Sequence, residues 1–472
     1  MIPMTLEEIA AAIGGRRLQS NQKQFAKPLP IRSVATDTRS AKEGDLFFAI
    51  RGANFDGQAF LSQAAHAGCV AAVVRVEPDM ERIGELFAGG LITVSDTTVA
   101  LNALAAHHRR KASAKVLAVT GSNGKTTTKL MIHHILSRRL RGTCSPKSFN
   151  NNIGVPLTLL GVSEGDDYVI CEVGTNAPGE IAALSAVARP DLAVITSVAR
   201  THLEKLASLE GVAAEKASIL GYLADGGLAV VWADSDALDK ALRQYDMPVK
   251  RFGESSRSDF RLTGYQSDGR RQRFEMNGSL WVELPLPGRH NALNALAAMA
   301  AADYLGVLPA EAAEALAGLS GAEMRLQWLA AGSVTIINDA YNANPASVLA
   351  AADVLADVCG SRRVMIVGDM RELGDQERQL HVQTGAAIAC RGVDLLIGVG
   401  SLGRYIAMGA AEAGMRTAAF ESLQDACRGA AAMLRAGDVV LVKGSRAMGM
   451  EKLIEPIRAA WAGGGACAAD RS

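Results

Sequence analysis

A glycine-rich segment between an apolar strand and a helical pattern constrains the fold of this chain more than any other feature. The segment reads Thr-Gly-Ser-Asn-Gly-Lys-Thr-Thr-Thr over residues 120–128. Residues 115–120 before it form the apolar run of a β-strand, and an apolar stripe that includes Met131 and Ile135 after it indicates a helix. Glycines permit a tight turn in which backbone N–H groups face phosphate oxygens, and the helix N-terminus adds a favourable dipole. The segment therefore predicts a phosphate-binding loop in an α/β fold.

Two side chains of this phosphate loop (residues 121–127) suit a nucleoside triphosphate. Lys125 can reach the β- and γ-phosphates of ATP, and the hydroxyl of Thr126 suits Mg²⁺. The full pattern G-x-x-x-x-G-K-[ST] is not met, because Val119 stands at the position of its first glycine. The shorter pattern, with its strand and helix flanks, still favours phosphate binding over a chance glycine turn. The residues that we expect to bind ATP here are Gly121, Ser122, Asn123, Gly124, Lys125, Thr126 and Thr127.

Length, charge and cysteine usage limit the class of protein. A chain of 472 residues exceeds what one compact core usually holds, so two to four domains are expected. The 49 Lys and Arg residues balance the 49 Asp and Glu residues, which argues against a nucleic-acid or membrane surface built on positive charge. The seven cysteines include no C-x-x-C pair and are expected to be buried thiols in a reducing compartment. Without a signal peptide or an apolar run of about 20 residues, we expect a cytoplasmic enzyme with no membrane insertion and no nucleic-acid partner, and we expect a monomer.

Short apolar runs alternate with longer helical patterns, which predicts an α/β protein with largely parallel sheets. The runs form three series and predict three α/β domains at residues 1–95, 96–322 and 323–472. The first is small, the second is a P-loop ATPase domain with a mainly parallel sheet, and the third is Rossmann-like. Residues 250–287 alternate polar and apolar and predict antiparallel strands, and the tail at 463–472 is expected to be disordered. The expected strands lie at residues 45–50, 69–74, 115–120, 168–173, 192–196, 228–232, 334–338, 363–367, 395–399 and 438–442.

Three titratable side chains follow the phosphate loop along the chain. Glu172 ends the strand at 168–173, where a carboxylate beside a phosphate loop is well placed to bind Mg²⁺; the alternative is a surface or turn-capping glutamate. His202 follows the next strand, and a lone histidine is usually structural. Lys216 lies in a helical pattern and by itself reads as a solvated lysine. From position alone, only Glu172 indicates a metal site.

Further polar residues lie at helix starts and strand ends. Asn291 and Asn294 share one face at the start of an Ala-rich helix, where amide side chains can pair with a nucleobase edge or cap the helix. Lys443 and Arg446 follow the last expected strand and are available for the carboxylate of a second substrate. The residues that crowd the end of the strand at 334–338, and indicate a site rather than a plain turn, are Asp339, Tyr341, Asn342 and Asn344.

These segments, in this order, resemble the Mur ligase family of peptidoglycan precursor synthesis. Residues 120–128 are similar to the ATP loop of the family, and residues 37–48 to its first domain, which holds the UDP-sugar end of the substrate. The segment Asn-Asp-Ala-Tyr-Asn-Ala-Asn-Pro at 338–345 resembles the branch of the family that adds D-alanyl-D-alanine. The other matching segments lie at residues 52–57, 150–156, 172–181, 202–204, 290–294, 367–374 and 442–446.

The resemblance implies an ATP-dependent amide ligase of cell-wall synthesis that uses ATP and Mg²⁺. Its substrates would be UDP-N-acetylmuramoyl-tripeptide and D-alanyl-D-alanine. The tripeptide carboxylate attacks the γ-phosphate of ATP, giving an acyl phosphate and ADP; the amine of D-alanyl-D-alanine then attacks that carbonyl and displaces phosphate. The implied UDP-sugar-binding residues are Thr38, Arg39 and Asn151.

The matching motifs also imply residue roles. Lys125, His202 and Lys216 would be catalytic. The implied metal-binding residues are Thr126, Glu172, His202, near a second ion, and Lys216, which falls where the family carries a lysine carbamylated by CO₂. The implied nucleotide contacts are Asn291 and Asn294 for adenine, Arg325 for a phosphate, Asp339 for the ribose, and Tyr341 and Asn342 beside them. Local departures from the family pattern occur at Asn152, Ala177 and Lys205.

Rival activities stay open at this stage. The ligase that adds the third-position diamino acid typically carries a D-N-P-R stretch, which this sequence lacks, and a folylpolyglutamate synthase would lack the first domain. A P-loop switch that binds nucleotide without ligating is disfavoured by Glu172, His202 and Lys216 together. ATP turnover that requires both substrates would separate a ligase from a switch.

Overall fold

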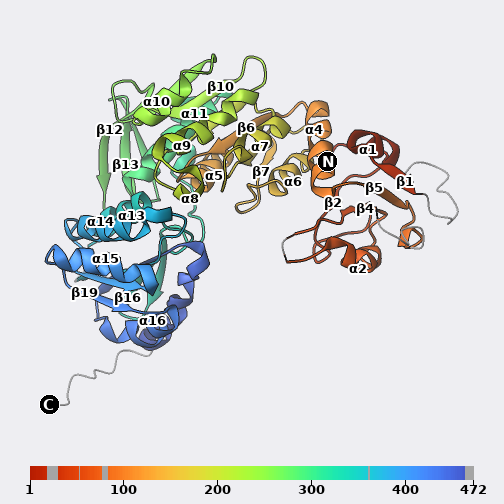
Figure 1. Cartoon of the computed structure of the whole chain (residues 1–472). Coiled ribbons are helices and arrows are strands. Elements are labelled where there is room, and N and C mark those ends of the chain that lie inside the picture. Colours follow the sequence, from red (N-terminus) through yellow and green to blue (C-terminus); the bar gives the residue numbers. More distant parts are fainter. Residues whose placement is uncertain (19–29, 53, 77–82, 360–361, 463–472) are drawn as a thin grey trace.

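Three β-sheets follow one another along the chain, each built from its own stretch of sequence (Figure 1). The computed structural model describes all residues except 19–29, 53, 77–82, 360–361 and 463–472. The predicted α/β class with mainly parallel sheets is confirmed. The tail that was expected to be disordered lies outside the described residues. None of the described helices is long and apolar enough to span a membrane.

The first sheet has five strands. In spatial order they are β1 (Arg16–Leu18), β5 (Leu91–Val94), β4 (Ala71–Arg75), β3 (Leu46–Phe48) and β2 (Val34–Ala35). β1 is antiparallel to β5, and the other pairs are parallel. β3 and β4 match predicted strands. β1 and β2 are too short to leave a clear apolar run, whereas β5 is fully buried and was not among the predicted strands. Helix α4 (Thr97–Lys111) then leads to the central sheet, and the Asp96 side chain caps its N-terminus.

The central sheet has nine strands. In spatial order they are β14 (Leu280–Leu284), β13 (Gln272–Met276), β12 (Phe260–Ser267), β11 (Val249–Gly253), β10 (Leu228–Trp232), β9 (Leu192–Ile195), β6 (Lys115–Thr120), β8 (Tyr168–Glu172) and β7 (Gly142–Cys144). The strands from β12 to β7 are parallel, and β12, β13 and β14 form the antiparallel strands predicted within residues 250–287. Because β6 lies between β9 and β8, the loops that follow these three strands meet at one edge of the sheet.

The third sheet has six strands. In spatial order they are β15 (Gln327–Ala331), β16 (Val334–Asp339), β20 (Asp438–Lys443), β17 (Arg362–Gly368), β18 (Leu395–Val399) and β19 (Thr417–Phe420). All neighbours are parallel except β15, which runs antiparallel to β16. The carboxyl ends of β16, β20 and β17 therefore lie together.

Helices cover both faces of the central sheet, because β6 is buried on both sides. Leu117 and Val119 pack with helices α5 and α11, while Val116 and Ala118 pack with α6 and α7 on the opposite face. The helices of the first and central parts are α1 (Leu6–Ile13), α2 (Leu61–His66), α4, α5 (Lys125–Leu136), α6 (Gly154–Leu160), α7 (Glu180–Ala188), α8 (Leu203–Leu206), α9 (Leu209–Ala217), α10 (Asp236–Leu242), α11 (Arg289–Tyr304) and α12 (Pro309–Leu316). Those of the third part are α13 (Pro345–Asp357), α14 (Glu377–Ala389), α15 (Gly400–Glu412), α16 (Leu423–Gly429) and α17 (Ile454–Ala462).

Candidate active site

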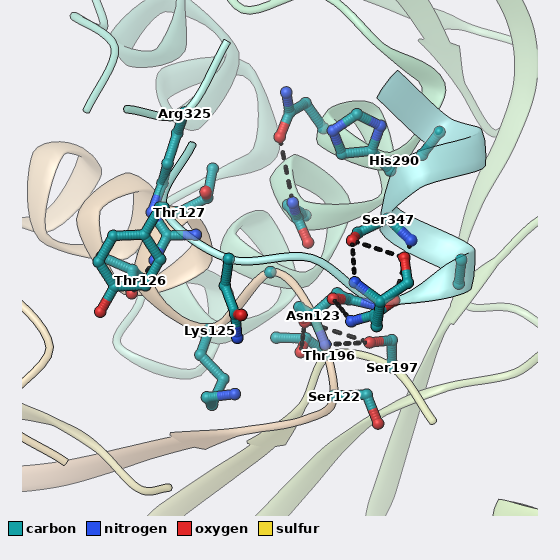
Figure 2. A pocket seen from close by; sticks show the side chains of 18 of the residues that line it. Ser122, Asn123, Lys125, Thr126, Thr127, Thr196, Ser197, His290, Arg325 and Ser347 are labelled. Carbon is teal, nitrogen blue, oxygen red and sulfur yellow. Dashed lines mark hydrogen bonds between the residues drawn. The ribbon is translucent and has the colours of Figure 1, made fainter. Parts of the chain in front are cut away.

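A cavity of about 480 Å³ lies where loops of the central sheet meet residues before and after β16 (Figure 2). The central part contributes the phosphate loop, the end of β8 and the start of α11. The third part contributes the end of β16 and of β20. The predicted site residues that line this cavity are Ser122, Asn123, Gly124, Lys125, Thr126, Thr127, Glu172, His202, Asn291, Asn294, Arg325, Asp339, Tyr341 and Asn342.

Close neighbours determine the shape of the phosphate loop. Gly121 has a φ of 142° and Gly124 a φ of 84°. A Cβ at Gly121 would lie 2.0 Å from Thr196 Oγ1, and a Cβ at Gly124 would lie 2.2 Å from Asn294 Oδ1, so both positions require glycine. Helix α5 begins at Lys125 without a side-chain cap, which leaves the N–H groups of its first turn available to phosphate oxygens.

Two cations lie at this loop. The Lys125 ammonium donates a 2.7 Å hydrogen bond to the backbone carbonyl of the first loop glycine. Arg325 extends towards α5, where its Nη2 donates to Thr126 Oγ1 at 3.0 Å, and its guanidinium lies 4.1 Å from the ring centroid of Tyr341 (Figure 2). Burial lowers the pKa of Lys125; the charge of Glu172 opposes this shift and that of Arg325 adds to it. Two adjacent cations at a helix N-terminus form a site for a polyanion.

The Glu172 carboxylate is buried beside the first turn of α5, so the alternative of a surface glutamate is wrong. Its Oε2 accepts from Thr126 Oγ1 at 2.8 Å, and its Oε1 accepts from Asn150 Nδ2 at 3.0 Å. A hydroxyl and a carboxylate oxygen are therefore neighbours at the edge of the cavity. Both are hard oxygen donors of the kind that Mg²⁺ prefers, so this pair fits a magnesium ion.

His202 and Lys216 are not bonded to that pair. Among the described residues, no hydrogen bond or ion pair joins either of them to Thr126 or Glu172. His202 lines the cavity, but its Nδ1 forms an ion pair with the Glu372 carboxylate, which follows β17. The hydrogen bond to His202 lowers the pKa of Glu372. No group of three or more His, Cys, Asp or Glu side chains is placed to hold a metal within the described part of the chain.

Lys216 is buried near the end of α9, with only 1% of its surface exposed, so it is not a solvated lysine. It is not among the residues that line the cavity. Burial lowers its pKa well below the ordinary value, and the charge of Lys125 lowers it further. The neutral amine is the form that reacts with CO₂, so this environment is compatible with the carbamylation that the resemblance implies.

The two predicted adenine contacts lie together on α11. Asn294 Nδ2 donates to Asn291 Oδ1 at 3.2 Å, and Asn291 Nδ2 donates to the Pro287 carbonyl at 2.7 Å. The alternative that Asn291 caps the helix is wrong, because the N-cap is Gly288 and no side chain caps this end. Next to them, burial lowers the pKa of His290 to about 4. The amides are thus buried and oriented at the cavity wall.

The end of β16 is joined to the end of β20. Lys443 Nζ donates to Asp339 Oδ2 at 2.6 Å and to the Asn342 carbonyl at 3.0 Å. Asp339 Oδ1 also accepts from the backbone N–H of Leu326 at 3.2 Å. Lys443, which we expected to be available for a second substrate, is therefore engaged with Asp339, while Arg446 forms an exposed ion pair with a neighbouring glutamate.

Three further side chains contribute to the site: Asn344, which the sequence placed in the cluster after the strand at 334–338 without a role, and Asn150 and Lys129, for which the sequence indicated none. Asn344 Nδ2 donates to Asn123 Oδ1 at 2.6 Å and so connects α13 to the phosphate loop. Asn150 orients Glu172, and Lys129 lies buried one turn after the start of α5, 3.3 Å from the same carboxylate. A lysine within an otherwise apolar helix stripe was the available signal for Lys129. Its counter-charge, Glu172, lies at the end of β8, far away in the sequence, so sequence alone could not identify the pair.

The predicted UDP-sugar residues do not line the cavity. Arg39 pairs with Asp37, and Thr38 Oγ1 donates to Gln63 Oε1 at 3.3 Å; both belong to the first part of the chain. Asn151 Oδ1 accepts from backbone N–H groups at the start of α6. Their role in substrate binding stays a prediction.

Known proteins match this chain along its whole length. Profiles described as "Mur ligase family, catalytic domain", "Mur ligase middle domain" and "Mur ligase, glutamate ligase domain" match residues 30–123, 119–302 and 324–446. A Bacillus subtilis (strain 168) protein named UDP-N-acetylmuramoyl-tripeptide--D-alanyl-D-alanine ligase is 36% identical over 97% of this chain and 99% of its own length. The Escherichia coli (strain K12) protein of the same name is 35% identical with the same coverage.

Solved structures agree in fold over a similar span. A crystal structure of MurF from Acinetobacter baumannii superposes with a TM-score of 0.86 at 31% identity, covering 97% of this chain and 99% of that one. The MurF ligase from Thermotoga maritima, in complex with ADP, superposes with a TM-score of 0.80 at 25% identity, covering 92% of this chain and 98% of that one. The predicted resemblance is thus confirmed from the first sheet to the third, and the chain belongs to the Mur ligase family.

Proposed function

We propose that this chain is an ATP-dependent ligase that adds D-alanyl-D-alanine to UDP-N-acetylmuramoyl-tripeptide and releases ADP and phosphate. One observation carries the proposal: the phosphate loop and the polar residues after β16 line the same cavity. Such a cavity lets a nucleotide held by the central part meet a substrate presented by the third part. The ligase name of relatives that match over the whole chain supports the choice of substrates.

In the first step, an oxygen of the tripeptide carboxylate attacks the γ-phosphorus of ATP, and the bond to the β–γ bridging oxygen breaks. The products are an acyl phosphate and ADP. We assign Lys125 and Arg325 to the negative charge of the transferring phosphoryl group, because both cations lie at the first turn of α5. Asn291 and Asn294 would orient the adenine, and Asp339 the ribose.

In the second step, the amine nitrogen of D-alanyl-D-alanine attacks the carbonyl carbon of the acyl phosphate. The bond from that carbon to the phosphate oxygen breaks, phosphate leaves, and the nitrogen gives up a proton. The C-terminal part of the chain would present the dipeptide, since its strands β16 and β20 end at the cavity. His202, on the cavity wall and paired with Glu372, is a candidate for a catalytic role in either step.

Thr126 and Glu172 would hold the magnesium ion, which, when bound, neutralises phosphate charge. Lys216 in carbamylated form would place an anion where the free side chain places an amine, close enough to Lys125 for their charges to interact. We also propose domain boundaries at residues 1–95, 96–322 and 323–472, because each range holds one whole sheet. A cytoplasmic monomer completes the proposal.

Phosphate release from ATP tests this function. The rate is measured with UDP-N-acetylmuramoyl-tripeptide, in the presence and absence of D-alanyl-D-alanine. We expect multiple turnovers only when both are present, because the acyl phosphate needs the amine to proceed. A rate that does not depend on the dipeptide would defeat the assignment of the second substrate.

A further inference from the structure

Lys129 is a buried cation that neither the phosphate chemistry nor the nucleotide contacts use. It lies one turn after Lys125 on α5 and is 1% exposed. Its ammonium donates to the Ser145 carbonyl at 2.8 Å and to the Lys147 carbonyl, and it lies 3.3 Å from Glu172 Oε2. The two carbonyls take two of the three N–H donors of the ammonium, and the Glu172 carboxylate supplies the opposite charge. A cation this deeply buried is stable only when such partners surround it, so these partners hold the Lys129 ammonium in one position.

Both carbonyls belong to the segment at residues 145–151, which is part of the connection from β7 to α6. Lys147 in this segment has a φ of 46°, a left-handed conformation that L-residues avoid, so local preference alone does not hold the turn. The far end of the segment is held by Asn150. Its Nδ2 donates to Glu172 Oε1 at 3.0 Å, and its carbonyl accepts from Gly174 N at 2.8 Å. Glu172 therefore connects the two ends, with the ammonium on one carboxylate oxygen and the amide on the other.

This segment carries residues that face two ligands. Asn150 lines the cavity in which we propose that ATP binds. Asn151 follows it directly, its Oδ1 accepts from backbone N–H groups at the start of α6, and it is the predicted UDP-sugar contact of this region. A shift of the segment relative to α5 would therefore move one substrate relative to the other. An error of about 1 Å between reacting groups is enough to lower a rate 10²-fold.

We propose that Lys129 is a positioning residue. Through the carbonyls of residues 145 and 147 and the carboxylate of Glu172, it fixes the segment at 145–151 against the first two turns of α5. The phosphate loop and the segment that meets the acyl substrate are thereby held in one arrangement. The catalytic consequence rests on the proposed function, whereas the structural clamp does not.

Amide hydrogen exchange of the ligand-free full chain tests the clamp. Lys129→Met removes the ammonium and keeps a side chain of similar length. We expect exchange in residues 145–151 to rise about tenfold or more, above any change in β10 or the third sheet, because only this segment loses its anchor. Arg109→Met is the matched control. It removes a cation whose side chain is 13% exposed and lies 2.7 Å from Asp191, which directly precedes β9 at the amino end of that strand. It should raise exchange without a local excess at 145–151.

Lys129→Gln serves as a second variant that folds more readily, since its amide can still donate to a carbonyl while the charge is lost. It should show the same local excess to a smaller extent. In both variants, the KM for UDP-N-acetylmuramoyl-tripeptide should rise about tenfold and turnover should fall about 10²-fold.

The outcomes separate the two proposals. If Lys129→Met and Lys129→Gln show no exchange excess at 145–151 over Arg109→Met, the clamp is wrong whatever the activity. A local excess with an unchanged KM for the UDP-linked substrate would overturn the positioning role. If the wild-type chain shows no dipeptide-dependent phosphate release, the proposed function fails, and the exchange result still decides the clamp.

Discussion

The phosphate loop at residues 121–127 and the turn at residues 37–39 are built in opposite ways. The loop is enclosed, since its glycines lie against Thr196 and Asn294 and leave no room for a Cβ. The turn lies on the surface, where the Arg39 side chain is 88% exposed and forms an ion pair with Asp37. The hydrogen bond from Arg39 lowers the pKa of Asp37 to about 2. One region presents donors to an incoming anion, and the other satisfies its own charges.

The two regions differ in how much they must rearrange to bind a ligand. The phosphate loop needs no reordering, because its neighbours already determine its conformation. The turn must give up an exposed ion pair, which contributes little to stability, and it needs other groups to enclose a ligand. Figure 1 shows the first sheet at the opposite end of the central part from the third sheet, so the turn and the third sheet lie far apart. We therefore expect the two regions to respond differently to substitution.

The largest expected effect comes from Lys125→Ala in the enclosed loop. Turnover should fall about 10³-fold, because a cation at the transferring phosphoryl group is lost. The thermal midpoint should change little, since the ammonium makes a single hydrogen bond to a backbone carbonyl. Phosphate release and thermal unfolding measure the two quantities. Lys240→Ala, at an exposed lysine, is the control. Full activity in Lys125→Ala would show that Lys125 has no role in phosphoryl transfer.

Glu172→Gln should lower turnover about 10²-fold and also destabilise the chain. The amide still accepts from Thr126, but Lys129 loses its counter-charge in a pair whose side chains are 1% and 2% exposed. Leaving one buried charge unpaired costs about 3 kcal/mol of unfolding free energy, which urea denaturation measures. Glu283→Gln, on the surface of β14, is the control. Unchanged stability would mean that the pair with Lys129 contributes nothing.

Arg39→Ala tests the exposed turn. We expect the KM for UDP-N-acetylmuramoyl-tripeptide to rise about tenfold, the equivalent of about 1.4 kcal/mol, while the KM for ATP and the urea midpoint stay the same. Steady-state kinetics in each substrate separate these effects, with Arg110→Ala on the exposed face of α4 as the control. An equal rise in the KM values for both substrates would show that the turn at 37–39 does not act on the UDP-linked substrate alone.

The smallest effect concerns stability and pH. Burial lowers the pKa of both His108, beside the first part, and His290, in the active site, to about 4 from an unfolded value of 6.5. Because the unfolded chain binds these protons at higher pH, stability is complete above pH 6.5 and is lost as the pH falls towards 4. The loss is roughly 2 kcal/mol per histidine by pH 5. His108→Gln keeps an acceptor for the Ile2 N–H and should remove the contribution of one histidine from this slope in urea denaturation at pH 7 and pH 5. An unchanged slope would show that His108 does not titrate in this window.

Much of the fold could be predicted because strands buried on both faces leave near-continuous apolar runs. β6, β9 and β20 are examples, since almost every residue in them is buried. The strands that escaped prediction, such as β2 and β7, have two and three residues, and their burial depends on neighbours that sequence patterns do not reveal. The phosphate loop was predictable for a related reason: its chemistry depends on backbone conformation, and glycine spacing encodes that conformation locally.

The partners that charged side chains meet across the fold were not predictable. Lys129 and Glu172 are 43 positions apart in the printed sequence, and His202 meets Glu372 from another sheet. Lys216 reads as a solvated helical lysine, yet α9 packs it into the protein, where its pKa falls. Which charges face one another follows from how strands of different segments align, and no local pattern records that alignment.

By itself, the sequence determined that a phosphate loop joins a parallel strand to a helix, and that three α/β series of the Mur ligase kind follow in order. These features rest on local backbone preference and on apolar periodicity. Only the tertiary structure decided that Arg325, Asp339 and Asn344 meet the phosphate loop at one cavity, while Arg39 stays on a distant surface. The reason is physical: desolvation and pairing of charges depend on distances in space, which only the packing of the sheets creates.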